Sequence, residues 1–145
     1  MRKHMYGEHP EIRDYGGEGI VFNIDHAASM NENFRMALWT GTDMQLTLMS
    51  IPVGGEIGME MHDDVEQLIR VESGRAKVYM GSTREDTREK ATVDGNYAII
   101  VPAGTWHNIV NVGNHPLKLY SVYAPPQHKK GTVHKTKEDA EREGH

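Results

Sequence analysis

Cysteine is absent from this chain of 145 residues. Its absence excludes a disulfide framework and any metal site built from thiolates. A bound metal ion would therefore have to be held by nitrogen and oxygen ligands. Such ligands favour Fe, Mn, Ni, Co or Zn as the divalent ion.

Long apolar runs and an excess of basic residues are also missing. No stretch approaches 18 apolar residues, so the sequence predicts no membrane-spanning helix. The first ten residues, MRKHMYGEHP, lead into no apolar run, so we expect no signal peptide and predict a cytoplasmic protein. Lys and Arg number 16 against 21 Asp and Glu, giving a net charge of -5, which argues against a nucleic-acid groove.

Short apolar runs separated by glycine and proline are what the sequence does contain. The chain has 15 Gly and 6 Pro, and about eight short strands with turns between them are expected. Many short strands without intervening helices predict an all-β jelly-roll barrel or sandwich, whose interior collects every second side chain. The polar stretch 82–96 is interpreted as a solvated hairpin or loop. The predicted strands are MALWT (36–40), MQLTLMSI (44–51), EQLIRV (66–71), RAKVYMG (75–81), YAIIVP (97–102), TWHNIVNV (105–112) and LKLYSVYA (117–124).

The two ends of the chain differ from this central barrel of residues 34–124. Residues 1–33 are polar and irregular, with one short turn near DHAASM (25–30), and we interpret them as an extension that packs on the barrel and supplies a strand to cover its edge. Residues 125–145 are expected to form a loop and a short helix. Thr136 is a candidate N-cap with Asp139 three residues on, and Gly144 is a stop signal.

One set of polar side chains has the types and spacing of a metal site. EMHDDVEQ (60–67) contains Glu60, His62 and Gln67, and PAGTWHNIVN (102–111) adds His107. Glu60 and His62 are two residues apart, so on an extended segment they face the same way. The other interpretation is a polar turn with a stray histidine. Glu66 is a rival ligand, but alternation places it on the face opposite Gln67.

The four side chains together would form a ligand set of two imidazoles, one carboxylate and one neutral amide. Two histidines and a carboxylate are the ligands of many open Fe(II) sites. The set carries a charge of -1, so a divalent ion would keep a net positive charge. That charge would polarise a bound carbonyl or acidify a bound water.

These segments resemble the two motifs of the cupin superfamily. Gly54 or Gly55 opens the first motif, which continues through His62 and the position of Gln67 to Gly74; the second motif matches at Pro102, Gly104, His107 and Asn111. The resemblance covers roughly residues 34–124 and implies a small β-barrel with a metal ion inside it. Glu60 stands where the motif has its first His, Gln67 where it has Glu, and Asn96 where it has Gly. A cupin barrel that has lost its metal is therefore the alternative.

The segments LWTG, LTLMSI, EIGMEMH and VPAGTWHN resemble a group of small bacterial and archaeal cupins. Members of this group are often labelled mannose-6-phosphate-isomerase-like, a label that implies no assigned reaction. The resemblance thus carries an expectation about the fold and the metal site, and none about one specific substrate.

Two functions of different classes follow from these patterns. The first is a metal-dependent enzyme acting on a sugar, a sugar phosphate or a keto acid by isomerase, lyase or oxygenase chemistry. Glu60 would be its general base unless it is a ligand. The second is a non-catalytic small-molecule-binding or sensor cupin, with or without metal. In either case we expect a homodimer. His128 and His134 are expected at the surface.

Overall fold

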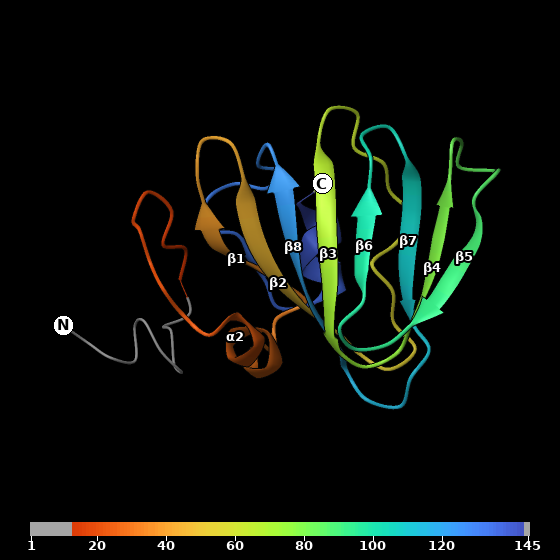
Figure 1. Cartoon of the computed structure of the whole chain (residues 1–145), viewed down its shortest axis with the longest axis horizontal. Helices are drawn as coiled ribbons and strands as arrows, with labels where there is room; N and C mark the ends of the chain where they lie inside the picture. Colours follow the sequence, from red (N-terminus) through yellow and green to blue (C-terminus); the bar gives the residue numbers. More distant parts are fainter. Residues whose placement is uncertain (1–12, 144–145) are drawn as a thin grey trace.

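The apolar runs form nine antiparallel strands in the part of the chain that the structure, a computed structural model, describes, residues 13–143. They are arranged in two sheets, and in Figure 1 the strands of the smaller sheet are seen to the right of those of the larger sheet. The larger sheet has the order β6 (Ala98–Val101), β3 (Glu66–Ser73), β8 (Leu117–Ala124), β2 (Gln45–Ile51), β1 (Arg35–Thr40) and β9 (Val133–His134). The smaller has the order β5 (Arg88–Val93), β4 (Ala76–Gly81) and β7 (Trp106–Asn111). The predicted all-β jelly-roll architecture is confirmed.

The core lies between the two sheets, where alternate residues of each strand point inward. In β8 the buried positions are Leu117, Leu119, Ser121 and Tyr123, as the alternation of the sequence predicted. Apolar side chains from β2 to β8 join one buried cluster at this interior. Its members include Met49, Ile51, Ile69, Val71, Val78, Ile99, Val101, Ile109, Leu117 and Leu119.

A second buried cluster lies on the outer face of β1 and β2, where the segment before β1 packs. Helix α2 (Ile24–Met30) contributes Ala27 and Ala28 to it, and the sheet contributes Leu46 and Leu48. The helix begins at Asn23, whose Oδ1 accepts a hydrogen bond from the backbone N–H of His26. The prediction of one short turn at 25–30 is therefore corrected to a seven-residue helix.

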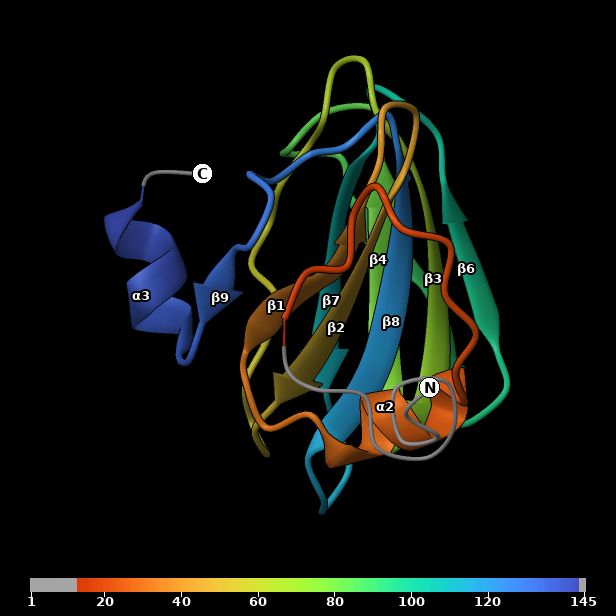
Figure 2. The same cartoon turned by 90° about the vertical axis from the view of Figure 1, so that its left-hand side faces the viewer.

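The C-terminal segment reaches the opposite side of the molecule from α2 (Figure 2). Strand β9 pairs with β1 and extends the larger sheet, and helix α3 (Lys137–Arg142) follows it. Thr136 and Asp139 form the predicted capping box; the expected stop, Gly144, lies outside the described residues. The prediction that residues 1–33 cover this edge is wrong for the described residues 13–33, which form no strand.

Two further features bear on the predictions. The polar stretch 82–96 contains strand β5, which pairs with β4 and is exposed except at Val93, so a hairpin forms there. No helix within residues 13–143 is long and apolar enough to cross a membrane.

Candidate metal centre

The segment that carries Glu60 and His62 runs beside β7 and is joined to it through the backbone. The N–H of Glu60 donates to the carbonyl of His107 at 3.0 Å, and the N–H of His107 donates to the carbonyl of Glu60 at 2.9 Å. The N–H of Gly104 donates to the carbonyl of His62 at 2.8 Å. Gly104 has φ +80, a left-handed conformation that favours glycine. The turn before β7 thereby fixes the two motifs against each other.

Three of the four predicted ligands lie together. One ligand atom from each of Glu60, His62 and His107 lies within 4.8 Å of the others. The Oε2 atom of Glu60 is 3.6 Å from Nε2 of His107 and 3.8 Å from Nε2 of His62. The His107 side chain is 1% exposed and that of Glu60 is 19% exposed. The structure thus brings a carboxylate and two imidazoles from distant parts of the sequence to one point.

The histidine rings are oriented with Nε2 toward the cluster. Nδ1 of His107 lies 3.1 Å from the carbonyl oxygen of Thr105, so the tautomer that donates there keeps the lone pair on Nε2. Nε2 of His107 and Nε2 of His62 are both buried and have no hydrogen-bond partner in the described part of the chain. A buried ring nitrogen whose other nitrogen is held by a carbonyl is the usual arrangement of a metal-binding histidine.

Glu60 is held in its ionised form. Burial alone would raise the pKa of its carboxyl group, but His107 and His62 outweigh that effect and hold the pKa well below its usual range. The cluster therefore offers one ionised carboxylate and two imidazole nitrogens as ligands. This donor set fits a divalent ion of the group Fe, Mn, Ni, Co or Zn.

Gln67 lies on the inward face of β3, and its rival Glu66 is exposed on the other face, as predicted. The Nε2 atom of Gln67 donates to Oγ of Ser121 at 3.2 Å, while its Oε1 is buried without a hydrogen-bond partner in residues 13–143. Gln67 pairs across the sheet with Tyr123, whose ring centroid is 6.0 Å from that of His62. Gln67 is thus a neighbour of the cluster with a free acceptor, and its role as fourth ligand stays a proposal.

Tyr123 connects the cluster with the rest of the barrel interior. Its ring also lies 5.3 Å from that of His128, at nearly a right angle. Burial raises the pKa of its hydroxyl group, while nearby Arg35 acts in the opposite direction. Sequence reasoning missed Arg35, which is 1% exposed on the inward face of β1.

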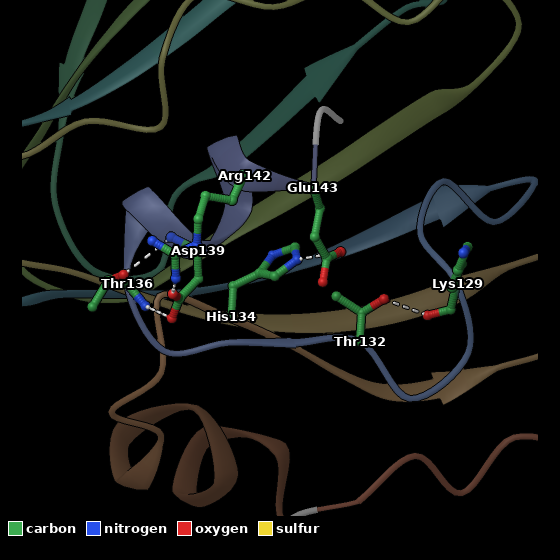
Figure 3. Close-up of polar contacts among 7 residues, drawn as sticks. All are labelled: Lys129, Thr132, His134, Thr136, Asp139, Arg142 and Glu143. Atoms are coloured by element: carbon green, nitrogen blue, oxygen red, sulfur yellow. Dashed lines mark hydrogen bonds and ion pairs between the residues drawn. The ribbon is translucent and has the colours of Figure 1, made fainter.

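Two histidines were predicted at the surface, and the structure corrects both. His134 is 1% exposed because β9 turns it inward, and its Nε2 lies 2.9 Å from Oε1 of Glu143 (Figure 3). His128 is half-buried against Tyr123. The sequence signal for the burial of His134 is the pair Val133–His134 just before the helix cap, and two residues are too few to identify a strand. His115 is exposed, as expected.

A pocket lies beside the Glu60 segment, and neither His62 nor His107 is part of its lining. This pocket, of about 340 Å³, is lined by Glu60 together with residues of the neighbouring segment 56–59, by Phe34 and Arg84, and by Lys137 and Glu141 of α3. Nζ of Lys137 lies 3.8 Å from a carboxylate oxygen of Glu56, so an ion pair links α3 to the Glu60 segment at this pocket.

Comparison with known proteins agrees with the fold. The family model of the cupin domain matches residues 47–123, which is more than half of the chain. The chain belongs to the cupin family. The uncharacterized protein YrkC of Bacillus subtilis (strain 168) is 52% identical to this cupin over 129 residues, covering 89% of this chain and 69% of YrkC.

Solved structures show the same fold. The crystal structure of BH2720 from Bacillus halodurans matches this cupin with a TM-score of 0.89 and 51% identity over 90% of this chain and 99% of BH2720. A predicted oxalate decarboxylase from Thermotoga maritima matches with a TM-score of 0.51 and 16% identity over 59% of this chain and 69% of its own. At that identity the second likeness concerns the fold alone.

Proposed function

We propose that this cupin is a metal-dependent enzyme acting on a small oxygenated molecule such as a sugar, a sugar phosphate or a keto acid. The observation that supports it most is the convergence of one ionised carboxylate and two unpartnered, buried imidazole nitrogens at Glu60, His62 and His107. Gln67 would be a fourth, neutral ligand. The ion would be Fe, Mn, Ni, Co or Zn.

Each residue of the site has its own role in this proposal. A divalent ion held there would polarise substrate oxygens and stabilise a developing enolate or oxyanion. His62 and His107 would provide nitrogen ligands, and the burial of His107 keeps water away from one side. The low pKa of Glu60 suits a ligand better than a general base at neutral pH, because a strongly acidic carboxyl group accepts protons poorly.

Isomerisation through an enediol, or decarboxylation, ranks ahead of dioxygen insertion in this proposal. Both reactions can use an ion that keeps its oxidation state and polarises a substrate oxygen, with a base that moves the α proton in the isomerisation, whereas dioxygen insertion needs an ion that changes oxidation state. The small cupins that this sequence resembles are often labelled isomerase-like. Isomerase activity is therefore part of this proposal, and the same experiment tests it.

The test is to incubate the metal-loaded protein with hydroxy-carbonyl sugars, sugar phosphates and keto acids in D₂O. NMR would follow deuterium at the α carbon and release of CO₂, and an electrode would follow dioxygen. The proposal expects exchange, decarboxylation or dioxygen uptake that His107→Ala abolishes and the matched surface variant His115→Ala retains. Turnover that survives His107→Ala would contradict it.

A second candidate, a non-catalytic sensor cupin, is favoured by one observation. The pKa of Glu60, the one carboxylate of the cluster, lies well below its usual range, so this side chain is a poor general base. This candidate expects saturable binding of a small molecule with no chemical change in it. Steady turnover of any substrate would remove it.

We also propose that the protein is a homodimer. Strand β6 is the edge of the larger sheet, and on its outward side Ile100 is 62% exposed beside Leu68 of β3 at 36%. A second copy of β6 related by a twofold axis would pair antiparallel with it and cover these side chains. Light scattering at micromolar concentration should give twice the chain mass of 16.3 kDa, and a monomeric mass would refute the proposal.

A further inference from the structure

On three neighbouring strands, β2, β8 and β3, the side chains that face the barrel interior change from apolar to polar at about the same height in the barrel. On β8 the inward residues run Leu117, Leu119, Ser121 and Tyr123. Three of the four residues paired with the two polar members are themselves polar, the exception being Ile69 of β3. Thr47 of β2 pairs with Ser121, and Gln67 of β3 pairs with Tyr123. These side chains form one polar layer inside the barrel, next to the metal centre.

Two buried atoms of this layer can each accept a hydrogen bond, and the metal centre does not account for both. Oγ1 of Thr47, a residue with 0% exposure, is one, and Oε1 of Gln67, 3% exposed and without a hydrogen-bond partner in the described residues, is the other. Unpartnered polar atoms in a protein interior are rare, because desolvation without a hydrogen bond is unfavourable. Oγ1 of Thr47 interacts with the Tyr123 hydroxyl, and a hydroxyl group has capacity for a further hydrogen bond to a polar group in the same layer.

The layer also contains small side chains and a positive charge. Ala37 of β1 pairs with Thr47, so Ala37, Thr47 and Ser121 form a row of small side chains across three strands. Arg35 lies two residues before Ala37 on the same inward face and is 1% exposed. Its guanidinium group lies near the Tyr123 hydroxyl, and the Tyr123 ring contacts that of His62.

We propose that Arg35, Thr47 and Tyr123 form a carboxylate-binding subsite beside the cluster of Glu60, His62 and His107. The planar fork of a guanidinium group matches the two oxygens of a carboxylate, and the hydroxyl groups of Thr47 and Tyr123 can each donate to it. The inference rests on the proposed function and narrows it, since the substrate becomes a small carboxylic acid whose second oxygen reaches the metal centre.

The experiment compares ligands that differ in one group. Protein reloaded with Co(II) is titrated by calorimetry with formate, oxalate and pyruvate, with hydroxyacetone as the neutral analogue of pyruvate, and with inorganic phosphate. We expect at least one carboxylate to bind, and pyruvate to bind at least tenfold more tightly than hydroxyacetone. Failure of all three carboxylates to bind, or tighter binding of phosphate than of any carboxylate, would overturn the proposal.

Variants separate the subsite from the metal centre. Arg35→Met should weaken carboxylate binding at least tenfold while leaving the Co(II) content and the Co(II) absorption spectrum unchanged. Thr47→Val, which keeps the shape of the side chain, should weaken it severalfold and serves where Arg35→Met does not fold. Arg88→Met, an exposed arginine of β5, is the matched control and should bind as the wild type does.

The outcomes distinguish the two proposals. Carboxylate affinity that is equal in wild type, Arg35→Met and Thr47→Val would refute the subsite while leaving the metal-dependent function standing. A wild-type protein that takes up no Co(II) refutes the metal-dependent function instead. The same titrations on that metal-free protein then decide whether Arg35 and Thr47 hold a carboxylate by themselves.

Discussion

At the scale of single residues, the function depends on how burial and partners set the charge of each ligand. Glu60 is ionised because His107 and His62 more than offset the effect of its burial. Gln67 is an amide at a similarly buried inward position, and its Oε1 has no hydrogen-bond partner in residues 13–143. A metal ion bound in this barrel would therefore have one negatively charged ligand. A carboxylate at position 67 would raise that number to two.

Gln67→Glu should tighten divalent-metal binding by tenfold or more, because an added charge within ligand distance is strongly attractive in a buried site. The same variant should destabilise the metal-free protein, because the new carboxylate is buried without a counter-ion. Chelator competition measures the first effect and urea unfolding the second. Glu66→Gln, on the exposed face of β3, should change neither, and a Gln67→Glu protein that binds metal no better than wild type would exclude Gln67 from the ligands.

The charge of Glu60 also predicts how the metal-free protein responds to pH. A carboxyl group whose pKa is lowered by folding stabilises the fold fully above its unfolded pKa, near 4.5, and loses this contribution as the pH falls toward the folded pKa. The difference in unfolding free energy between wild type and Glu60→Gln should be constant above about pH 5 and shrink below it. Urea unfolding with a chelator present measures it. A difference that grows as the pH falls would contradict the assignment.

At the scale of elements, β7 positions the site and Asn111 fixes the end of that strand. Its Nδ2 donates to the carbonyl groups of Ile51 at 3.0 Å and His115 at 2.9 Å. Its Oδ1 accepts from the N–H of Gly113 at 2.9 Å. Asn111 is thus the part of the second motif that holds the turn after β7, while His107 is the part that faces the cluster.

Asn111→Ala should lower the free energy of unfolding by about 2–4 kcal/mol, since it leaves buried backbone groups without partners. Urea unfolding is the measurement, with Asn114→Ala as the control in the exposed part of the same turn. A loss below about 0.5 kcal/mol, the usual range of surface substitutions, would show that the three hydrogen bonds do not stabilise the turn.

The elements that the sequence predicted well are those with a clear period. LKLYSVYA alternates, and β8 buries the residues expected. Strand β5 was less evident because only Val93 of its six residues is buried, so it shows no alternation. Helix α2 was taken for a turn because seven residues give little helical periodicity and its two buried members are alanines.

At the scale of the whole molecule, the metal centre joins segments that are far apart in the chain, and only part of it was predictable. Spacing and residue type identified Glu60, His62 and His107. They could not identify Arg35 or Thr47, because their relation to the site depends on the register of β1, β2 and β8. They also misplaced His134, whose burial depends on the two-residue pairing of β9 with β1.

Because the three candidate ligands come from segments far apart in the chain, metal binding is expected to raise the free energy of unfolding of the whole fold. A divalent ion at 100 times its dissociation constant should add about 2.7 kcal/mol to the free energy of unfolding. For a chain of this size that amounts to a rise in Tm of roughly 5–10 °C. Scanning fluorimetry with and without metal should show this rise in wild type and His115→Ala but not in His107→Ala. An equal rise in all three proteins would indicate binding elsewhere.

The central claim is that this cupin holds a divalent ion at Glu60, His62 and His107. Elemental mass spectrometry of protein purified without a nickel column tests it most directly. The structure predicts close to one equivalent of Fe, Mn, Ni, Co or Zn per chain, and loss of that metal in His107→Ala. Protein that contains no metal as purified and takes up none when each of these ions is added would contradict the claim.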